Sequence, residues 1–342
     1  MCKSIKKKFY NNLTYFKLLE AHDRAKQGKT NKKEIILFEM DLETNLMNLY
    51  RKLKTGKYKM GKYREFTIYE PKERLIKALP YVDRIVHQWY IEEFIKPFIV
   101  PKFISTSFAC IETKGTHAAV KKLQQYMRLM KRKNNSYYIL KCDIKKYFYT
   151  INKNILFNIM QSYISDKKLL ELTKLFIFDD ENSKGIPIGN YTSQFFANIY
   201  LDKLDHFIKE KLRVKYYVRY MDDFILLLKN KEEAKQMLEE IKSFLTDKLD
   251  LELNKKTRYY PNKQGIDFCG YKIYETHIKI RKRSIKKIKN KIKIWNKQYA
   301  MNKLDFHNFL LCFNSFKGHI KHANCYNLYN KLVSTIDFKD LL

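Results

Sequence analysis

The residues best suited to chemistry are two adjacent aspartates, Asp222 and Asp223, which lie between two strongly apolar runs. Residues 216–221 and 224–228 are rich in aromatic, Val, Ile and Leu side chains, a pattern that predicts a β-hairpin with the acids at its tip. Adjacent carboxylates in so apolar a setting repel each other and lose hydration, a cost that a divalent cation removes. Two cations held roughly 3.5–4 Å apart catalyse phosphoryl transfer by clamping the attacking and leaving oxygens. We therefore predict a metal site here, with a polar hairpin turn as the alternative.

A second acidic pair, Asp179 and Asp180, provides a comparison within the same sequence. It is followed by Glu181, Asn182 and Ser183, all polar residues, with a glycine soon after. Such a composition is typical of a surface loop. We expect an ordinary loop at this position and no metal site.

A third carboxylate belongs to the predicted metal site if a strand brings it there. Asp143 ends an expected strand at 136–144, and a basic pair follows it. A carboxylate at the end of a strand can meet the tip of a neighbouring hairpin across a sheet, and a two-cation site requires such a third ligand. The alternative is that Asp143 caps the helix that follows, a role that aspartate also favours.

Two further positions suit contact with a nucleotide. Lys72 and Arg74 lie at the turn between expected strands at 63–69 and 75–79, where an ammonium and a planar guanidinium could hold a triphosphate. Local sequence alone favours a solvated turn there. Phe148 follows Asp143 by five residues, and its ring could occupy the space of a ribose 2′-hydroxyl. The alternative is a core ring in a chain with 15% aromatic residues.

Two loops complete the candidate site. Residues 185–194 form a glycine-punctuated loop that runs into an expected helix, and a loop followed by a helix N-terminus suits contact with a nucleotide or a template strand. Such loops more often only connect elements. A lysine in the short loop at 253–257 could protonate the departing pyrophosphate.

The charge of the chain indicates its partner. Its 342 residues carry a formal net charge of +33, which would be self-repulsive without a polyanion, so nucleic acid is the expected partner. An anionic membrane surface is the rival partner, but no apolar run approaches the ~18–20 residues of a spanning helix. The basic N-terminus lacks the apolar core of a signal peptide, and we expect a cytoplasmic protein. The six cysteines show no CxxC pair, and reduced thiols are expected.

The strongest basic segment is 276–297, which holds ten Lys and Arg residues and no acid. A helical stripe of Ile285, Ile288, Ile292 and Trp295 runs through it, with Ser284 expected as the helix cap. We therefore predict a folded basic helix that binds the phosphate backbone of a nucleic acid. The residues assigned to this contact are Arg281, Lys282, Arg283, Lys286 and Lys287.

Most of the chain, from residue 63 to 274, resembles the reverse transcriptases, with several motifs in the family's order. Residues 220–223 (Tyr-Met-Asp-Asp) resemble the metal box of the polymerase palm, and 141–148 resemble the preceding metal motif. The resemblance implies that Asp143 and Asp222 bridge two Mg²⁺ ions, with Mn²⁺ as an alternative. It also implies that Ile144 contributes its carbonyl and that Asp223 is an auxiliary acid.

The same resemblance assigns roles to the other candidates and reverses the local preferences given above. Phe148 matches the ribose gate, Lys72 and Arg74 match the fingers residues that hold the triphosphate, and Lys256 matches the proton donor, with Lys255 as a near rival. The implied fold is α+β with the right-hand polymerase architecture. Its expected parts are an N-terminal helical extension (1–60), fingers and the start of the palm (61–142), a palm containing a fingers segment at about 150–185 (143–275), and a basic helical thumb (276–342).

Within that superfamily, the run from Ile188 to Gln194 resembles the reverse transcriptases of diversity-generating retroelements. Most relatives in the superfamily have Gln at the first of these positions and Pro at the last. The turn at 70–72 and the box at 114–117 (Lys-Gly-Thr-His) resemble the same group. The resemblance adds Ile188 and Gln194 to the dNTP-binding residues. It implies template RNA, error-prone cDNA synthesis at template adenines, and a small basic oligomeric accessory protein as partner. The alternatives are a phage-defence or other group II intron-like reverse transcriptase, a catalytically inert RNA-binding scaffold, and a membrane-surface protein.

Overall fold

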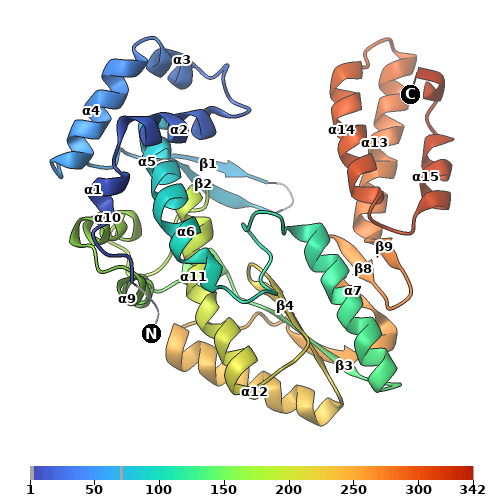
Figure 1. Ribbon diagram of the computed structural model, residues 1–342. Helices are drawn as coiled ribbons and strands as arrows, with labels where there is room; N and C mark the ends of the chain where they lie inside the picture. Colours follow the sequence, from blue (N-terminus) through green and yellow to red (C-terminus); the bar gives the residue numbers. More distant parts are fainter. Residues whose placement is uncertain (1–3, 70–71, 342) are drawn as a thin grey trace. The chain divides into compact units, whose positions relative to one another are not determined.

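The computed structural model describes residues 4–69 and 72–341, which form two compact units (Figure 1). The first unit comprises Met1–Ile111, Asp143–Arg213 and Glu239–Lys256. The second comprises Glu112–Cys142, Val214–Leu238 and Thr257–Leu342. The chain therefore alternates between the units, and each unit is described below by itself. The part of the predicted turn formed by residues 70 and 71 lies outside the described residues.

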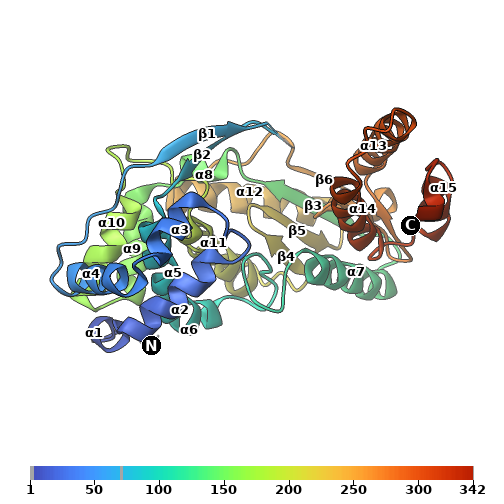
Figure 2. The same cartoon turned by 90° about the horizontal axis from the view of Figure 1, so that it is seen from above.

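The first unit begins with the predicted N-terminal helices. They are α1 (Phe9–Asn12), α2 (Tyr15–Lys26), α3 (Lys33–Glu39) and α4 (Leu42–Lys54). The hydroxyl of Thr14 caps α2 by accepting from the backbone N–H of Lys17. Helix α2 packs against α4 and against α5 (Tyr81–Tyr90), so these helices form one layer (Figure 2).

Two short antiparallel strands follow these helices, as the alternating sequence predicts. Strand β1 (Arg64–Ile68) pairs with β2 (Arg74–Ala78) in a register that sets Arg64 opposite Ala78 and Ile68 opposite Arg74. Arg74 therefore lies at the end of β2 nearest the turn. Helix α5 begins at Tyr81 and continues through a π-helical segment (Ile91–Ile95) into α6 (Lys96–Phe98).

The rest of the first unit is helical and surrounds one central helix. The flanking helices are α8 (Tyr147–Thr150), α9 (Lys153–Tyr163) and α10 (Lys167–Ile177). The central helix is α11 (Tyr191–His206), which packs against α5 and α9. Helix α11 is buried on nearly all sides, so its core face is much wider than the single apolar stripe of a surface helix.

The second unit is built on a four-stranded sheet with strand order β4–β5–β3–β6. The strands are β3 (Tyr138–Asp143), β4 (Tyr217–Tyr220), β5 (Asp223–Leu228) and β6 (Arg258–Pro261). Helix α7 (Thr116–Lys133) packs against β4 and β5 through the apolar positions that its sequence period predicts. Helix α12 (Lys231–Leu249) follows β5 and carries the chain towards the last segment of the first unit.

A second, three-stranded sheet replaces the single hairpin that the sequence suggests at 265–280. Its strands are β7 (Ile266–Phe268), β8 (Tyr271–Ile273) and β9 (Ile278–Ile280), all antiparallel. The extra turn occurs at Cys269 and Gly270, both of which have positive φ. The glycine allows a reversal inside what looks like one apolar run.

The C-terminal helices form a small bundle with its own core (Figure 1). They are α13 (Lys282–Ala300), α14 (Phe306–Ile320) and α15 (Tyr326–Val333). Ile288, Ile292 and Trp295 are buried there, as predicted. The predicted cap at Ser284 is wrong, because the cap position of α13 is three residues earlier, at Arg281. Across the described residues, no helix combines the length and apolarity needed to cross a bilayer.

Candidate functional site

The acidic pair of the second unit lies on the tight hairpin that the sequence predicts. Tyr220 pairs with Asp223, so Met221 and Asp222 alone form the turn between β4 and β5. Met221 has a φ of 54°, which is uncommon for a residue with a side chain and strained by roughly 1–2 kcal/mol. The guanidinium of Arg219, which is fully buried, donates to the Met221 carbonyl at 3.0 Å. This hydrogen bond from Arg219 stabilises the turn, and the turn places Asp222 at the tip of the hairpin.

Asp223 stands at the start of β5, with its side chain 27% exposed. The ammonium of Lys141, on β3, donates to Asp223 Oδ2 at 3.2 Å and also to the backbone carbonyl of Asp267. Asp223 also affects the thiol of Cys269. Burial, and secondly the negative charge of Asp223, raise the pKa of this thiol to about 12. The acid thus lies in a partly dehydrated setting, where binding of a cation would be favoured.

The third acid, Asp143, is the last residue of β3 and the point where the chain enters the first unit. Its backbone carbonyl accepts from the N–H of Asn254 at 2.7 Å, and the next residue, Ile144, is buried and bridged to Leu253. The alternative role as a helix cap is wrong, because the residue at the N-cap of α8 is Lys146.

The loop that carries Lys256 therefore lies beside the backbone of Asp143 within the first unit. The backbone N–H of Lys256 donates to the side chain of Asn254, the residue that binds the Asp143 carbonyl. Both Lys255 and Lys256 are exposed. Their side chains are accessible for proton transfer, and the structure does not separate one from the other.

Two of the predicted nucleotide-binding residues, Phe148 and Ile188, make backbone hydrogen bonds that link neighbouring elements of the first unit. Phe148 is on α8, and its carbonyl accepts from the N–H of Ile186 at 2.8 Å. The Ile188 carbonyl accepts from the N–H of Lys77, on β2, at 2.9 Å. The segment containing Ile186 and Ile188 thus touches both α8 and β2. Lys72 and Arg74 are exposed at the end of the β1–β2 hairpin.

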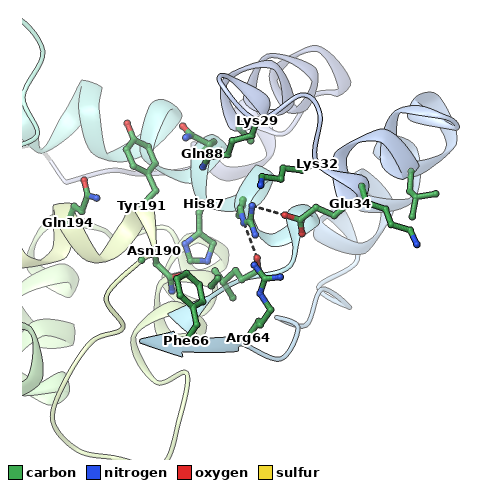
Figure 3. Close-up of a pocket in the computed structure, with 17 residues that line it drawn as sticks. Lys29, Lys32, Glu34, Arg64, Phe66, His87, Gln88, Asn190, Tyr191 and Gln194 are labelled. Atoms are coloured by element: carbon green, nitrogen blue, oxygen red, sulfur yellow. Dashed lines mark hydrogen bonds and ion pairs between the residues drawn. The ribbon is translucent and has the colours of Figure 1, made fainter. Parts of the chain in front are cut away.

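Gln194 lies elsewhere, in the first turn of α11, where it lines a wide basic pocket of about 860 Å³ (Figure 3). The Cys110 thiol donates to its side-chain oxygen at 3.3 Å. The pocket also exposes the ring of Phe66, and Gln88, which is half-buried, lines it as well. Its basic side chains are those of Lys29, Lys32, Lys33, Arg64 and Arg84.

The positive charge of this pocket comes from lysine and arginine rather than histidine. Burial lowers the pKa of His87 to about 3, so the imidazole is neutral, and its Nδ1 is 2.8 Å from the hydroxyl of Thr192. Arg84 is paired with Glu34 at 2.9 Å. A mixture of cations, exposed rings and amides is typical of sites for unpaired nucleic acid. The three N-terminal lysines of this pocket were not identified by the sequence reasoning, because nothing local marks them.

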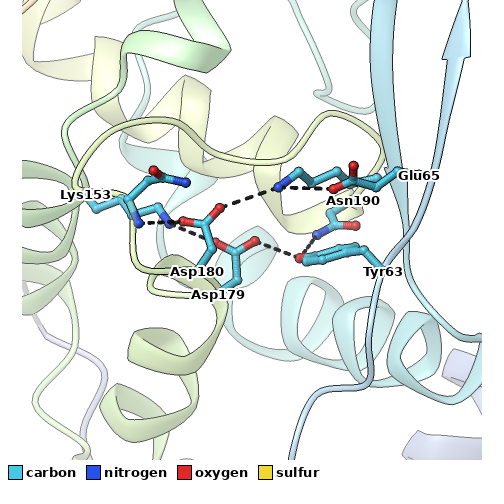
Figure 4. A network of polar contacts seen from close by, with 8 residues as sticks. Tyr63, Glu65, Lys153, Asp179, Asp180 and Asn190 are labelled. Carbon is cyan, nitrogen blue, oxygen red and sulfur yellow. Dashed lines mark hydrogen bonds and ion pairs between the residues drawn. The ribbon is translucent and has the colours of Figure 1, made fainter.

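Asp179 and Asp180 lie in a loop, as the sequence predicts, but this loop is not an ordinary one, because Asp179 is buried in an ion cluster. Asp179 has a side chain only 1% exposed, and Lys153, at 0% exposure, donates to both carboxylates, at 3.0 and 2.6 Å (Figure 4). The hydroxyl of Tyr63 donates to the other oxygen of Asp179 at 2.9 Å. A buried ion cluster therefore occupies what reads as a polar loop. No local signal identifies it, because Lys153 is 26 residues away and looks like an ordinary surface lysine.

The basic helix α13 presents most of its predicted nucleic-acid contacts to solvent. Lys282, Arg283, Lys286 and Lys287 are exposed. Arg281 is half-buried, and its guanidinium lies 3.6 Å from Asp267. Four of the five basic side chains are thus accessible to phosphate, whereas the fifth is engaged within the second unit.

The donor atoms available to a metal are oxygens: the carboxylates of Asp143, Asp222 and Asp223 and the carbonyl of Ile144, the type of ligand that Mg²⁺ prefers. Asp143 belongs to the first unit and the acidic pair to the second. Among His, Cys, Asp and Glu side chains in residues 4–69 and 72–341, no group of three or more is arranged as a metal site. The chemistry of the donors fits Mg²⁺, and the assignment remains a prediction.

Comparisons with known proteins place these motifs in a family. The model of the family described as reverse transcriptase (RNA-dependent DNA polymerase) matches residues 61–273, more than half of the chain. Among curated proteins, the chain is 26% identical over 223 residues to a COX1/OXI3 intron 2 protein of Saccharomyces cerevisiae, covering 46% of this chain and 26% of that protein. It is 22% identical over 305 residues to the group II intron-encoded protein LtrA of Lactococcus lactis subsp. cremoris, covering 68% and 50%. The chain spans at most half the length of these two relatives.

Solved structures show the same fold. An apo telomerase from Candida tropicalis gives a TM-score of 0.52 at 13% identity, covering 85% of this chain and 65% of that one. A telomerase of the same organism solved with a fragment of telomeric RNA gives 0.51 at 16% identity, covering 86% and 61%. The predicted α+β fold with right-hand polymerase architecture is confirmed at the level of fold. By the family match over residues 61–273, the chain belongs to the reverse transcriptase (RNA-dependent DNA polymerase) family.

Proposed function

We propose that this protein is a cytoplasmic RNA-directed DNA polymerase that extends a 3′-hydroxyl with dNTPs on an RNA template. The observation that carries the proposal is the strained two-residue turn that presents Asp222 and Asp223 within a chain of this family. Met221, at positive φ and held by the buried Arg219, fixes the two acids at the tip of the hairpin.

The proposed metal ligands are Asp143, Asp222 and Asp223 with the carbonyl of Ile144, and the expected group is a pair of Mg²⁺ ions, with Mn²⁺ as an alternative. When bound, the ions supply a lowered pKa for the 3′-hydroxyl and stabilisation of charge on the transferring phosphoryl group. Lys256, exposed in the loop that contacts the Asp143 backbone, is proposed to give a proton to pyrophosphate as it leaves.

The proposed nucleotide-binding residues act by position and charge. Lys72 and Arg74, exposed at the tip of the β1–β2 hairpin, bind the triphosphate of the incoming dNTP. Phe148, anchored through its carbonyl to Ile186, excludes a ribose 2′-hydroxyl. These assignments divide the chain as the sequence reasoning does: extension (1–60), fingers (61–142), palm (143–275) and thumb (276–342).

The template is proposed to reach the enzyme through two basic surfaces. The pocket lined by Lys29, Lys32 and Arg64 combines cations with an exposed ring, which suits an unpaired strand (Figure 3). The exposed basic face of α13 suits the backbone of a duplex. The telomerase structure that contains RNA supports RNA as the template class.

The test is primer extension on an RNA template with Mg²⁺. The double variant Asp222→Ala, Asp223→Ala is expected to lose dNTP incorporation while retaining RNA binding, because only the metal ligands are removed. Wild-type-like synthesis by this variant would contradict the assignment. Retention of RNA binding by a wild-type chain that incorporates no dNTP in Mg²⁺ or Mn²⁺ would instead favour the inert scaffold.

Within the family, we propose that the enzyme serves a diversity-generating retroelement, copying template RNA into error-prone cDNA with a small basic oligomeric accessory protein. Support comes from Ile188, at a position where most members of the superfamily carry Gln. Isoleucine cannot donate a hydrogen bond near the incoming base, so the geometry of pairing is less constrained. Ile188→Gln is expected to lower misincorporation opposite template adenine, measured by sequencing the cDNA. An unchanged error spectrum would favour a phage-defence or other group II intron-like role.

A further inference from the structure

A group of buried and half-buried polar side chains in the first unit has no place in the metal and nucleotide assignments above. We call it the polar clamp, and its members are Tyr63, Lys153, Asp179, Asp180 and Asn190 (Figure 4). Burying a lysine with carboxylates gains little stability over apolar residues of the same size. The presence of the polar clamp therefore calls for a role beyond stability.

The polar clamp is a continuous chain of hydrogen bonds between three segments. Lys153, the first residue of α9, donates to Asp179 and Asp180 in the loop after α10. Tyr63, which directly precedes β1, donates to Asp179 and accepts from the Asn190 amide at 2.8 Å. Burial first, and then Asp179, raise the pKa of Tyr63 far above its ordinary value, so the phenol keeps the proton that it donates.

On one side, the polar clamp holds the β1–β2 hairpin. The ammonium of Lys77, on β2, lies 3.5 Å from both Asp180 and Glu65, and the Lys77 N–H donates to the Ile188 carbonyl. Gly189 has a φ of 127°, and a Cβ there would meet the Lys77 carbonyl oxygen at 2.9 Å. The loop before α11 therefore lies directly against the strand, at a distance that only glycine allows.

On the other side, the polar clamp holds the backbone around α8. The backbone N–H of Lys153 donates to the Ser183 carbonyl at 3.0 Å, and the backbone N–H of Gly185 donates to the Ile151 carbonyl at 2.8 Å. The Ile186 N–H then reaches the Phe148 carbonyl. Residues 183–190 are thus fixed against α8 at one end and against β2 at the other, with the polar clamp between them.

We propose that the polar clamp positions the incoming dNTP, by holding in register the β1–β2 hairpin, α8 and the 185–190 loop. These elements carry Arg74, Phe148 and Ile188, so the inference rests on the proposed function and deepens it. The clamp residues are positioning residues that do not touch the substrate. Their loss lets the three elements shift, which weakens dNTP binding and loosens the fit of Phe148 against the sugar. The metal-binding acids are unaffected.

The test uses a mild variant with a matched control. Tyr63→Phe removes the hydroxyl that joins Asp179 to Asn190 and preserves the ring. Tyr58→Phe removes a comparable hydroxyl, which donates to Asp83 on α5 at 2.6 Å in the same unit. Both variants lose one tyrosine–carboxylate hydrogen bond, so comparable falls in thermal midpoint are expected. Only Tyr63→Phe is expected to raise KM for dNTP, by about five-fold, the equivalent of one hydrogen bond of about 1 kcal/mol.

The remaining readouts separate positioning from general damage. In the Tyr63→Phe variant, kcat at saturating dNTP and the Kd for the primer–template duplex stay within about two-fold of wild type, since a positioning loss acts on ground-state binding. Discrimination of dNTP against rNTP falls. Lys153→Met is expected to show the same pattern, a raised KM for dNTP with little change in kcat, and its rise in KM should be larger. Its thermal midpoint must first show that the variant is folded.

Two results would overturn the inference while leaving the proposed function intact. One is an unchanged KM and sugar discrimination in Tyr63→Phe when the wild-type chain incorporates dNTP normally. The other is an equal rise in KM in Tyr58→Phe, which shows that any lost hydrogen bond in this unit has the same effect. Absence of incorporation by the wild-type chain itself refutes the proposed function and the clamp together.

Discussion

The chain contains two adjacent aspartate pairs, and the structure treats them in opposite ways. Asp179 and Asp180 share a lysine that is fully buried, and Asp179 is almost as inaccessible. Asp222 lies in a strained turn, and Asp223, the first residue of β5, is paired with a lysine that remains 20% exposed. The first pair is held by a lysine with no exposure to solvent, whereas the second lies at the tip of a hairpin beside a partly exposed lysine.

The difference teaches that the setting of a carboxylate depends on its long-range partner more than on its neighbours in the sequence. In the polar context Asp179 is buried, because Lys153 and Tyr63 reach it from 26 and 116 residues away, whereas Asp180 is 33% exposed. In the apolar context neither acid is fully buried, because Asp222 lies in a two-residue turn and Asp223 begins the strand that follows it. One pair is suited to hold structure and the other to hold a cation.

The largest expected effect separates the two pairs by activity. Asp222→Asn removes a charged metal ligand and is expected to reduce dNTP incorporation by about a thousand-fold or more, consistent with the loss of several kcal/mol of transition-state stabilisation. Its unfolding free energy in urea should stay within ~0.5 kcal/mol of wild type, since the residue lies on an accessible turn. Primer extension and equilibrium unfolding measure the two quantities.

Asp179→Asn is the matched change in the other pair, with the opposite expectation. It leaves Lys153 partly uncompensated in a buried site and should lower the unfolding free energy by about 3 kcal/mol, while kcat at saturating dNTP is preserved. The comparison fails if Asp222→Asn is destabilising and active, or if Asp179→Asn abolishes turnover in a protein that unfolds like wild type.

A smaller effect compares the two lysines. Lys153→Met breaks an ion cluster whose lysine is fully buried and is expected to cost about 3–5 kcal/mol of stability. Lys141→Met removes a partner of Asp223 that is 20% exposed and should cost about 1 kcal/mol, because solvent partly screens that pair. Urea denaturation of both variants against wild type measures the difference. Equal costs would mean that burial does not distinguish the two pairs.

The sequence predicts well whatever is encoded locally. The alternation at 216–228 gives the hairpin, the apolar stripe of α13 gives the C-terminal core, and Asp143 falls at the end of its strand as expected. The tight turn can be predicted because two apolar strands flank only two residues. These features depend on neighbours that are two to four residues apart.

What the sequence does not reveal depends on tertiary partners. The ion cluster of Asp179 requires Lys153. Lys153 directly follows the asparagine that caps α9, and in the sequence it looks like a lysine at any exposed helix start. The basic pocket requires lysines from the N-terminal helices to meet Arg64 on β1. The extra strand at 271–273 requires a reversal at Cys269 and Gly270 inside an apolar run. In each case the structure depends on a long-range contact, whereas the local sequence pattern around each residue predicts only an ordinary helix, strand or loop.

The smallest expected effect is the dependence of folding stability on pH that comes from Asp180. Burial raises the pKa of Asp180, but hydrogen bonds from Lys153 and Asn182 outweigh it and lower the pKa below the ordinary value of 3.8. A carboxylate with a depressed pKa in the folded state adds stability above its unfolded pKa, and this contribution is lost as the pH falls below about 4. In Asp180→Asn, the urea midpoint should therefore decline less between pH 5 and pH 3 than in wild type.

Asp250 provides the control for that measurement. Hydrogen bonds from Lys184 and Asn152 lower its pKa as well, but its side chain is 42% exposed and the Lys184 side chain 48%. Asp180 is itself 33% exposed, but its partner Lys153 is fully buried, so added salt should screen this pair less than the pair of Asp250 and Lys184. Raising the ionic strength to about 0.5 M should therefore reduce the effect of Asp250→Asn more than the effect of Asp180→Asn. Equal sensitivity to salt would show that Asp180 behaves as a surface acid, and the contrast between the two aspartate pairs would then rest on Asp179 alone.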